Sequence, residues 1–241
     1  MKPTTTISYS WKNSNIVDEI DMYFQSIGYQ FRRDTRDLEY TQSIKDFMAV
    51  IRESDFILVI ISDEFLKSKN CMIEALHALK EKEYKRKILP IVLDDANIFD
   101  RDGKSNIDGK LSYINYWEDE KKRMLKIVEG KEPQKIVKVI EEIKIIEDIV
   151  NQIDFFISLM SDMRYESLDE LKKSGFKVIL ERIGFKREDL LHELLKIVNI
   201  EDIEEKELEL DSFLKVYPKH EEANFLKAFH EGEKKNYKKS A

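Results

Sequence analysis

Residues 56–79 read FILVIISDEFLKSKNCMIEALHAL, and the rest of the chain is organised around them. The stretch opens with six apolar residues, Phe56–Ile61, most of them β-branched. Such a run predicts a strand buried on both faces of a parallel sheet. A helix is predicted to begin near Asn70, because apolar residues recur at the spacing of one helix face: Met72, Ala75, Leu76 and Leu79.

Glu74 lies off this apolar stripe, in the first turns of the predicted helix, on the face that also holds Cys71 and Ala78. The helix macrodipole favours an ionised carboxylate near the N-terminus. In open α/β sheets, ligands bind at the carboxyl ends of the strands, which is where this helix begins. Glu74 is therefore a candidate functional acid. The alternative is a glutamate that only answers the helix dipole.

The composition is that of a globular chain with a heavily charged surface. Of the 241 residues, 42% are hydrophobic and 37% charged, and the formal net charge is −7. A net negative charge offers no basic footprint for nucleic acid. The lone Cys71 cannot form an internal disulfide, which fits a reducing cytosol. With no long apolar segment, we expect neither export nor a membrane span, and a cytoplasmic location.

Strands and helices alternate over the first half of the chain. Strands are predicted at residues 4–10, 29–33, 56–61, 88–93 and 111–117. The first helix follows Asn13 and stops at Gly28, a residue type that favours the position after a helix end. Another helix, capped by Ser43, precedes the central strand. Alternation of this kind predicts parallel pairing through right-handed crossovers.

Several short motifs in this half occur in a fixed order. They are the box Ile7-Ser8-Tyr9-Ser10-Trp11, the run Arg36-Asp37-Leu38, Ser54-Asp55-Phe56, and the element from Ser68 to Leu76 that holds Cys71 and Glu74. Together they resemble the Toll/interleukin-1 receptor (TIR) domain family, in its bacterial type. The resemblance covers about residues 4–130. It implies an α/β fold, with a flavodoxin-like five-stranded parallel sheet flanked by helices, and a TIR domain at residues 1–130.

The resemblance also implies a function. Some TIR domains are NAD⁺ glycohydrolases or cyclases, and in these a glutamate at the position of Glu74 is catalytic. Substrate-binding roles are then expected for residues around the strand ends and the start of the helix: Tyr9, Ser10, Trp11, Asp34, Asn70 and Cys71. For Cys71 a small helix-packing residue is the alternative, and for Trp11 a surface position. NAD⁺ is the substrate, and neither a cofactor nor a metal is expected.

Two positions depart from the family pattern. Asn70 stands where many active relatives have tryptophan, so one wall of the pocket is expected to be absent or to come from another subunit. Thr41 stands where the family often has glycine, in the loop of residues 34–41 that the family uses in assembly. Because active sites of this family are often completed between protomers, a homo-oligomer through TIR domains is expected.

Residues 131–241 show only helical patterns. A heptad-like seam spans residues 136–160, and additional apolar positions at Ile140, Ile149 and Phe156 favour a helical bundle over a free coiled coil. The last stretch weakly resembles one tetratricopeptide repeat, a helix pair that binds proteins. We therefore expect a helical region that controls oligomerisation and receives a protein or signal partner.

The function expected from these observations is NAD⁺ cleavage at the nicotinamide–ribose bond, activated by oligomerisation in a bacterial defence or signalling system. A non-enzymatic TIR adaptor, acting through TIR–TIR contacts, is the alternative. An enzyme resembling deoxyribosyltransferases, which would prefer nucleosides, is a third hypothesis.

Overall fold

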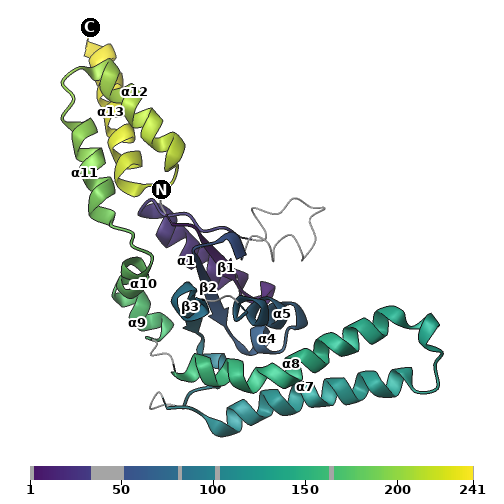
Figure 1. The fold of residues 1–241 in the computed structure, drawn as a ribbon. Helices are drawn as coiled ribbons and strands as arrows, with labels where there is room; N and C mark the ends of the chain where they lie inside the picture. The colour runs from purple at the N-terminus through teal and green to yellow at the C-terminus, as the bar shows by residue number, and fades with distance from the viewer. Residues whose placement is uncertain (1–2, 34–51, 81–82, 101–103, 163–165, 241) are drawn as a thin grey trace. The chain divides into compact units, whose positions relative to one another are not determined.

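The computed structural model describes residues 3–33, 52–80, 83–100, 104–162 and 166–240 (Figure 1). The chain forms two compact units. One, here called the sheet unit, contains residues 3–14 and 32–177; the other, the helical unit, contains Asn15–Phe31 and the chain from Val178 onward. These units are defined by contacts within the structure, whereas the predicted division at residue 130 is the end of a family domain. That predicted division therefore stays a prediction.

The centre of the sheet unit is a parallel sheet in the order β1-β2-β3. β1 (Thr5–Ser8) pairs with β2 (Phe56–Ile61), and β2 pairs with β3 (Ile88–Val92). The last five residues of β2 are at most 2% exposed, as its continuous apolar run predicts. Helices flank the sheet, so the predicted α/β class with parallel pairing is confirmed.

The predicted sheet of five strands is wrong in number, because the described residues contain three strands. The predicted strand at residues 29–33 is reduced to one parallel bridge, between Arg32 and Thr6. Arg32 exchanges two backbone hydrogen bonds with β1, of 2.9 and 3.0 Å. The residues just before Arg32 belong to the core of the helical unit instead. There the rings of Phe24, Tyr29 and Phe31 pack together, with centroids 4.6–6.0 Å apart.

The predicted last strand, residues 111–117, lies within a helix, α7 (Ile107–Val128). Asn106 caps it, its side chain accepting from the amide of Gly109. Tyr113 and Trp117 are buried four residues apart, whereas Leu111 is 48% exposed. Burial thus follows helical spacing rather than the alternation of a strand. The aromatic and β-branched content of the segment had favoured a strand, and the helix cap and tertiary packing override that preference.

Short helices connect β2 to β3. α4 (Asp63–Leu66) follows β2 directly, capped by Ser62, and α5 (Lys69–Ala78) is capped by Ser68. α5 ends at Ala78, and a separate turn of helix, α6 (Tyr84–Lys87), leads into β3. After β3 come a 3₁₀ turn, η2 (Asp94–Ala96), and an antiparallel bridge between Phe99 and Ser105.

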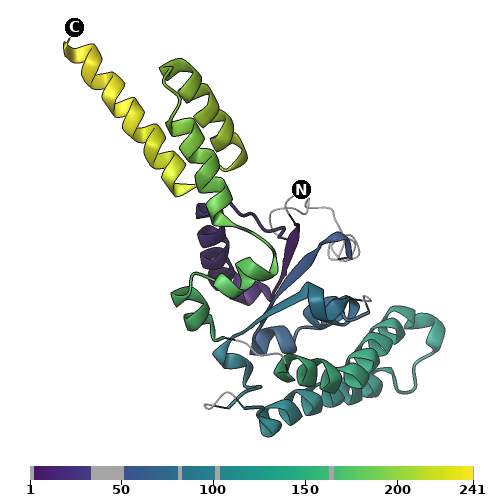
Figure 2. The same ribbon diagram turned by 60° about the vertical axis from the view of Figure 1, so that its left-hand side comes forward.

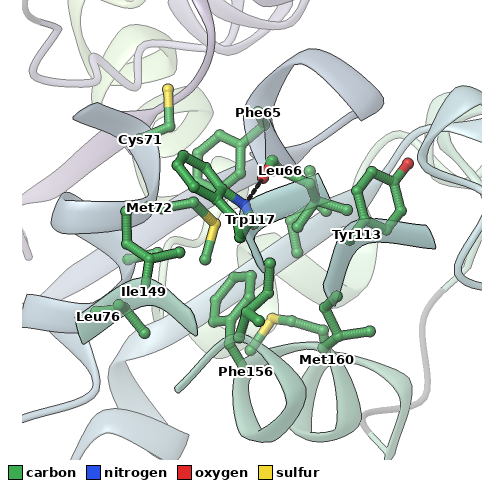
Figure 3. Packing of buried hydrophobic residues seen from close by; sticks show 14 of the residues in the cluster. Phe65, Leu66, Cys71, Met72, Leu76, Tyr113, Trp117, Ile149, Phe156 and Met160 are labelled. Atoms are coloured by element: carbon green, nitrogen blue, oxygen red, sulfur yellow. Dashed lines mark hydrogen bonds between the residues drawn. The ribbon is translucent and has the colours of Figure 1, made fainter. Parts of the chain in front are cut away.

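The heptad-like seam forms α8 (Val137–Asp162), which runs back along α7 (Figures 1 and 2). A 3₁₀ turn, η3 (Pro133–Lys135), connects them, and α9 (Leu168–Lys173) follows α8. α8 also packs on α5, and its buried residues join one core with α4, α5 and α7. Figure 3 shows this core, with Phe156 and Met160 below Trp117, whose Nε1 donates to the Leu66 carbonyl at 2.8 Å. The apolar seam of α8 is thus buried against α5 and α7, and the predicted bundle of residues 131–241 stays a prediction.

The helical unit combines α1 (Ser14–Ser26) with helices from the end of the chain. These are α10 (Lys177–Arg182), α11 (Arg187–Val198), α12 (Ile203–Val216) and α13 (Glu221–Ser240). Gly28 ends α1 as predicted, with a φ of 83°, and a Cβ there would lie 2.4 Å from Leu190 Cδ1. An open apolar groove of about 620 Å³ lies between α11 and α13. The predicted tetratricopeptide resemblance and signal partner stay predictions.

We expect the core formed by α8 to make a large contribution to stability. Phe156 is 1% exposed and its neighbour Phe155 is 54% exposed. Phe156→Ala should lower the free energy of unfolding by about 3–5 kcal/mol, because it removes a buried ring and leaves a cavity. Phe155→Ala, the matched control, should change it by less than about 1 kcal/mol. Urea unfolding followed by circular dichroism measures both, and equal losses would contradict the packing of α8.

Candidate functional site

The three parallel strands end at the same edge of the sheet, which we call the carboxyl edge. β1 ends at Ser8, β2 at Ile61 and β3 at Val92. The polar residues Ser8, Ser10 and Ser62 are buried there, each at most 7% exposed. Buried hydroxyls require hydrogen-bond partners, so this edge holds a set of polar contacts rather than apolar packing.

Glu74 lies on α5 and accepts a hydrogen bond at this edge. Ser8 Oγ donates to Glu74 Oε2 across 2.8 Å, joining residues 66 positions apart in the chain. Because α5 begins at Lys69, Glu74 is its sixth residue and lies in the second turn. The dipole effect falls off within the first turn, so the Ser8 hydroxyl is the more direct source of stabilisation for this carboxylate.

Cys71 connects the start of α5 to the segment after β1. Its thiol donates to the backbone carbonyl of Tyr9 at 3.6 Å, and the side chain is buried. Figure 3 shows the sulfur directed away from Met72 and the apolar core. Arg33, also buried, donates from Nη2 to the Tyr9 hydroxyl at 3.1 Å. Cys71 and Tyr9 therefore lie together, and their contacts fix the backbone beside Ser8, while their substrate-binding roles stay predictions.

The other predicted substrate-binding residues differ in exposure. Trp11, in the 3₁₀ turn η1 (Trp11–Asn13), is 74% exposed, and Asn70 is exposed on the first turn of α5. Ser10 is buried, and its carbonyl accepts from the amide of Asn13 at 2.7 Å. Asp34 and the departure at Thr41 lie outside the described residues. The substrate-binding roles of all these residues stay predictions.

Contacts between neighbouring strand ends make the carboxyl edge continuous. Ser62 Oγ donates to Asn13 Oδ1 at 2.6 Å and accepts from the amide of Phe65 at 3.0 Å. Lys12 forms an exposed ion pair with Glu64 at 2.6 Å. The turn after β1 is thus tied to the turn after β2, which places the Ser8 and Glu74 pair on a supported scaffold.

A second polar group lies where β2 and β3 end. The Tyr113 hydroxyl is 2.6 Å from the Ala96 carbonyl and 2.9 Å from Asp63 Oδ1, with both oxygens as acceptors. Burial, followed by the neighbouring Asp63, raises the pKa of Tyr113. Burial likewise raises the pKa of Asp95. This group fastens α7 to the sheet edge. Among the described residues no set of three His, Cys, Asp or Glu side chains could hold a metal ion.

A parallel sheet with flanking helices and an acid at its carboxyl edge defines an α/β domain with a potential ligand site. Residues 6–128 match the family model of the TIR domain. The match covers more than half of the chain, so this chain belongs to the TIR domain family. No curated protein and no solved structure matches the sequence. Within the described ranges, no helix combines the length and apolar character that spanning a membrane requires.

The sequence did not identify Ser8 as a site residue, although it placed Ser8 in the polar box at the end of the first strand. The missing information was three-dimensional, because the contact joins β1 to α5 through the folding of the chain. One signal was available: a serine at the last position of a buried strand needs a partner for its hydroxyl.

We expect Glu74 to contribute little to folding. Glu74→Gln keeps an acceptor for Ser8 Oγ and removes the charge, so the free energy of unfolding should change by less than about 1 kcal/mol. For a chain of this size that corresponds to about 2–4 °C in the melting temperature. Calorimetry of both proteins tests this. A drop of more than about 10 °C would make Glu74 a structural residue.

Proposed function

We propose that this TIR domain protein is an NAD⁺ glycohydrolase or cyclase that cleaves the nicotinamide–ribose bond, with Glu74 as the catalytic residue. The observation that supports the proposal is the hydrogen bond of 2.8 Å from Ser8 to Glu74 at the carboxyl edge. It holds an acid where open α/β sheets bind ligands. A glutamate that served only the helix dipole of α5 would not need a buried hydroxyl donor from β1.

The chemistry needs little from the protein beyond charge and position. Nicotinamide is a good leaving group, and bond cleavage passes through an oxocarbenium-like transition state. An ionised Glu74 would accept hydrogen bonds from the ribose hydroxyls and stabilise the growing positive charge. No proton donor is required for that step. Water as acceptor gives hydrolysis, and a ring atom of the same substrate gives cyclisation.

The walls of the proposed pocket are the segment after β1 and the start of α5. Trp11 offers an exposed indole that can stack on nicotinamide or adenine. Asn70 is exposed one turn before Glu74, where it presents an amide instead of an aromatic ring. A pocket with one polar, open wall is consistent with completion by a second subunit, which the resemblance to the TIR family also implies.

Activity should disappear with the Glu74 carboxylate. We expect Glu74→Ala to lower the rate of nicotinamide release from NAD⁺ by about a hundredfold or more, the usual cost of losing electrostatic stabilisation. The matched control is Glu53→Gln, an exposed glutamate just before the amino end of β2, on the opposite edge of the sheet. It should retain the full rate. Nicotinamide is quantified by liquid chromatography, with circular dichroism to confirm folding.

The alternative is a TIR adaptor without enzymatic activity. Absence of nicotinamide release from concentrated wild-type protein would favour that alternative, as would equal rates in the wild type and Glu74→Ala. A nucleoside-processing enzyme would instead release base from deoxynucleosides faster than nicotinamide from NAD⁺, so both substrates belong in the assay. An adaptor role in bacterial defence or signalling would depend on TIR–TIR contacts and tolerate loss of Glu74.

Assembly should raise the activity. If a second subunit completes the pocket, the rate per protomer should increase as the protein concentration rises above the dissociation constant of the oligomer. The full chain is needed for this experiment, because a fragment of residues 1–130 would lack α8 and expose its partners on α5 and α7. Light scattering at each concentration gives the oligomeric state. A constant specific activity across a change in state would contradict the shared pocket.

A further inference from the structure

We propose that Ser8 is a positioning residue for the reaction: its hydroxyl holds the Glu74 carboxylate in the orientation and charge state that bond cleavage requires. This inference rests on the proposed function and adds to it a second residue of the same site. Ser8 would act through Glu74 and would not itself contact the substrate.

The geometry gives the direction of the hydrogen bond. A carboxylate only accepts, so the Ser8 hydroxyl must be the donor across the 2.8 Å to Oε2. Ser8 is 3% exposed, whereas Glu74 is partly exposed. The donor is therefore shielded from water, which strengthens its interaction with a charge, while the carboxylate stays accessible to a ligand.

The support for Ser8 is rigid. Ser8 is the last residue of β1 and lies opposite Val59 in the parallel register with β2. The next residue, Tyr9, is held by the Cys71 thiol, which lies three residues before Glu74 on α5. The donor end of the hydrogen bond is therefore fixed by β1 and its pairing with β2. The acceptor end is fixed by α5, which the Cys71 contact ties to the end of β1. A fixed donor reduces the number of orientations that the flexible glutamate side chain can adopt.

A hydroxyl in this place matters more to the transition state than to substrate binding. Positive charge grows on the ribose as the bond breaks, so the position and ionisation of Glu74 count most at that point. Loss of the Ser8 donor should therefore lower kcat more than it changes KM. It should also move the acid limb of the pH–rate profile to higher pH, because the ionised carboxylate loses a donor that favours it.

The test compares Ser8→Ala with Ser8→Thr. Ser8→Ala should lower kcat by about tenfold to a hundredfold, the range expected for a hydrogen bond to a charged group. Ser8→Thr keeps a hydroxyl on a residue type that suits strands, and should retain most of the wild-type kcat. The control is Ser54→Ala, which removes a buried hydroxyl whose partner is Thr6 Oγ, 2.6 Å away. It should reduce thermal stability and leave kcat unchanged.

A second measurement does not depend on activity. In protein labelled with ¹³C-glutamate, the side-chain carboxyl resonance of Glu74 is assigned by its loss in Glu74→Gln. We expect its titration midpoint to rise in Ser8→Ala and to return towards the wild-type value in Ser8→Thr. An unchanged midpoint in Ser8→Ala would overturn the inference, whether or not the wild type cleaves NAD⁺.

The two proposals fail in different ways. If the wild type does not cleave NAD⁺, the proposal that the protein is an NAD⁺-cleaving enzyme is wrong. The catalytic role of Ser8 is then wrong as well, even if the titration midpoint of Glu74 shows that Ser8 holds its carboxylate. An active wild type with an unchanged kcat in Ser8→Ala leaves the enzyme standing and overturns the role of Ser8. A loss of kcat in Ser8→Ala that Ser54→Ala reproduces would show a general effect of stability and would also overturn it.

Discussion

The pairing of β2 with strands on both of its edges is the constraint on which the rest of the structure depends. β2 lies between β1 and β3, and its side chains are buried on both faces. This arrangement leaves the strand no freedom of register, because a shift by one residue would move buried side chains against the wrong neighbours. The carboxyl edge, and with it the approach of β1 to α5, is fixed by that register. The distance from Ser8 to Glu74 is therefore a consequence of strand pairing far more than of any local preference.

The elements that the sequence predicted well are those with one dominant signal. The apolar run of β2 and the glycine after α1 each indicated the observed structure. Residues 111–117 carried two conflicting signals, aromatic residues that suit strands and a spacing of Tyr113 and Trp117 that suits a helix. The outcome was decided by packing on α4 and α8, which short-range patterns do not contain. The membership in the TIR domain family could be predicted because its motifs depend on order along the chain.

The candidate site was predictable in part for the same reason. Glu74 is recognisable from its neighbours in sequence, and Cys71 from its place one turn earlier. The contact with Ser8 brings two motifs together, and neither motif alone indicates which serine of the box reaches the acid. Exposure also lies beyond a one-dimensional pattern. Trp11 and Tyr9 are two residues apart in one motif, yet one is open to solvent and the other is buried.

The chain has two tryptophans, and they lie in opposite environments. The indole of Trp117 is enclosed in the core and bonded to the Leu66 carbonyl, whereas that of Trp11 is open to solvent beside the carboxyl edge. Their fluorescence should therefore be separable, with a blue emission from the interior and a red, readily quenched emission from the surface. The blue emission of Trp117 should report unfolding of the core, and the red emission of Trp11 should report binding of a ligand at the carboxyl edge. The protein thus carries one spectroscopic reporter for its fold and another for its candidate site.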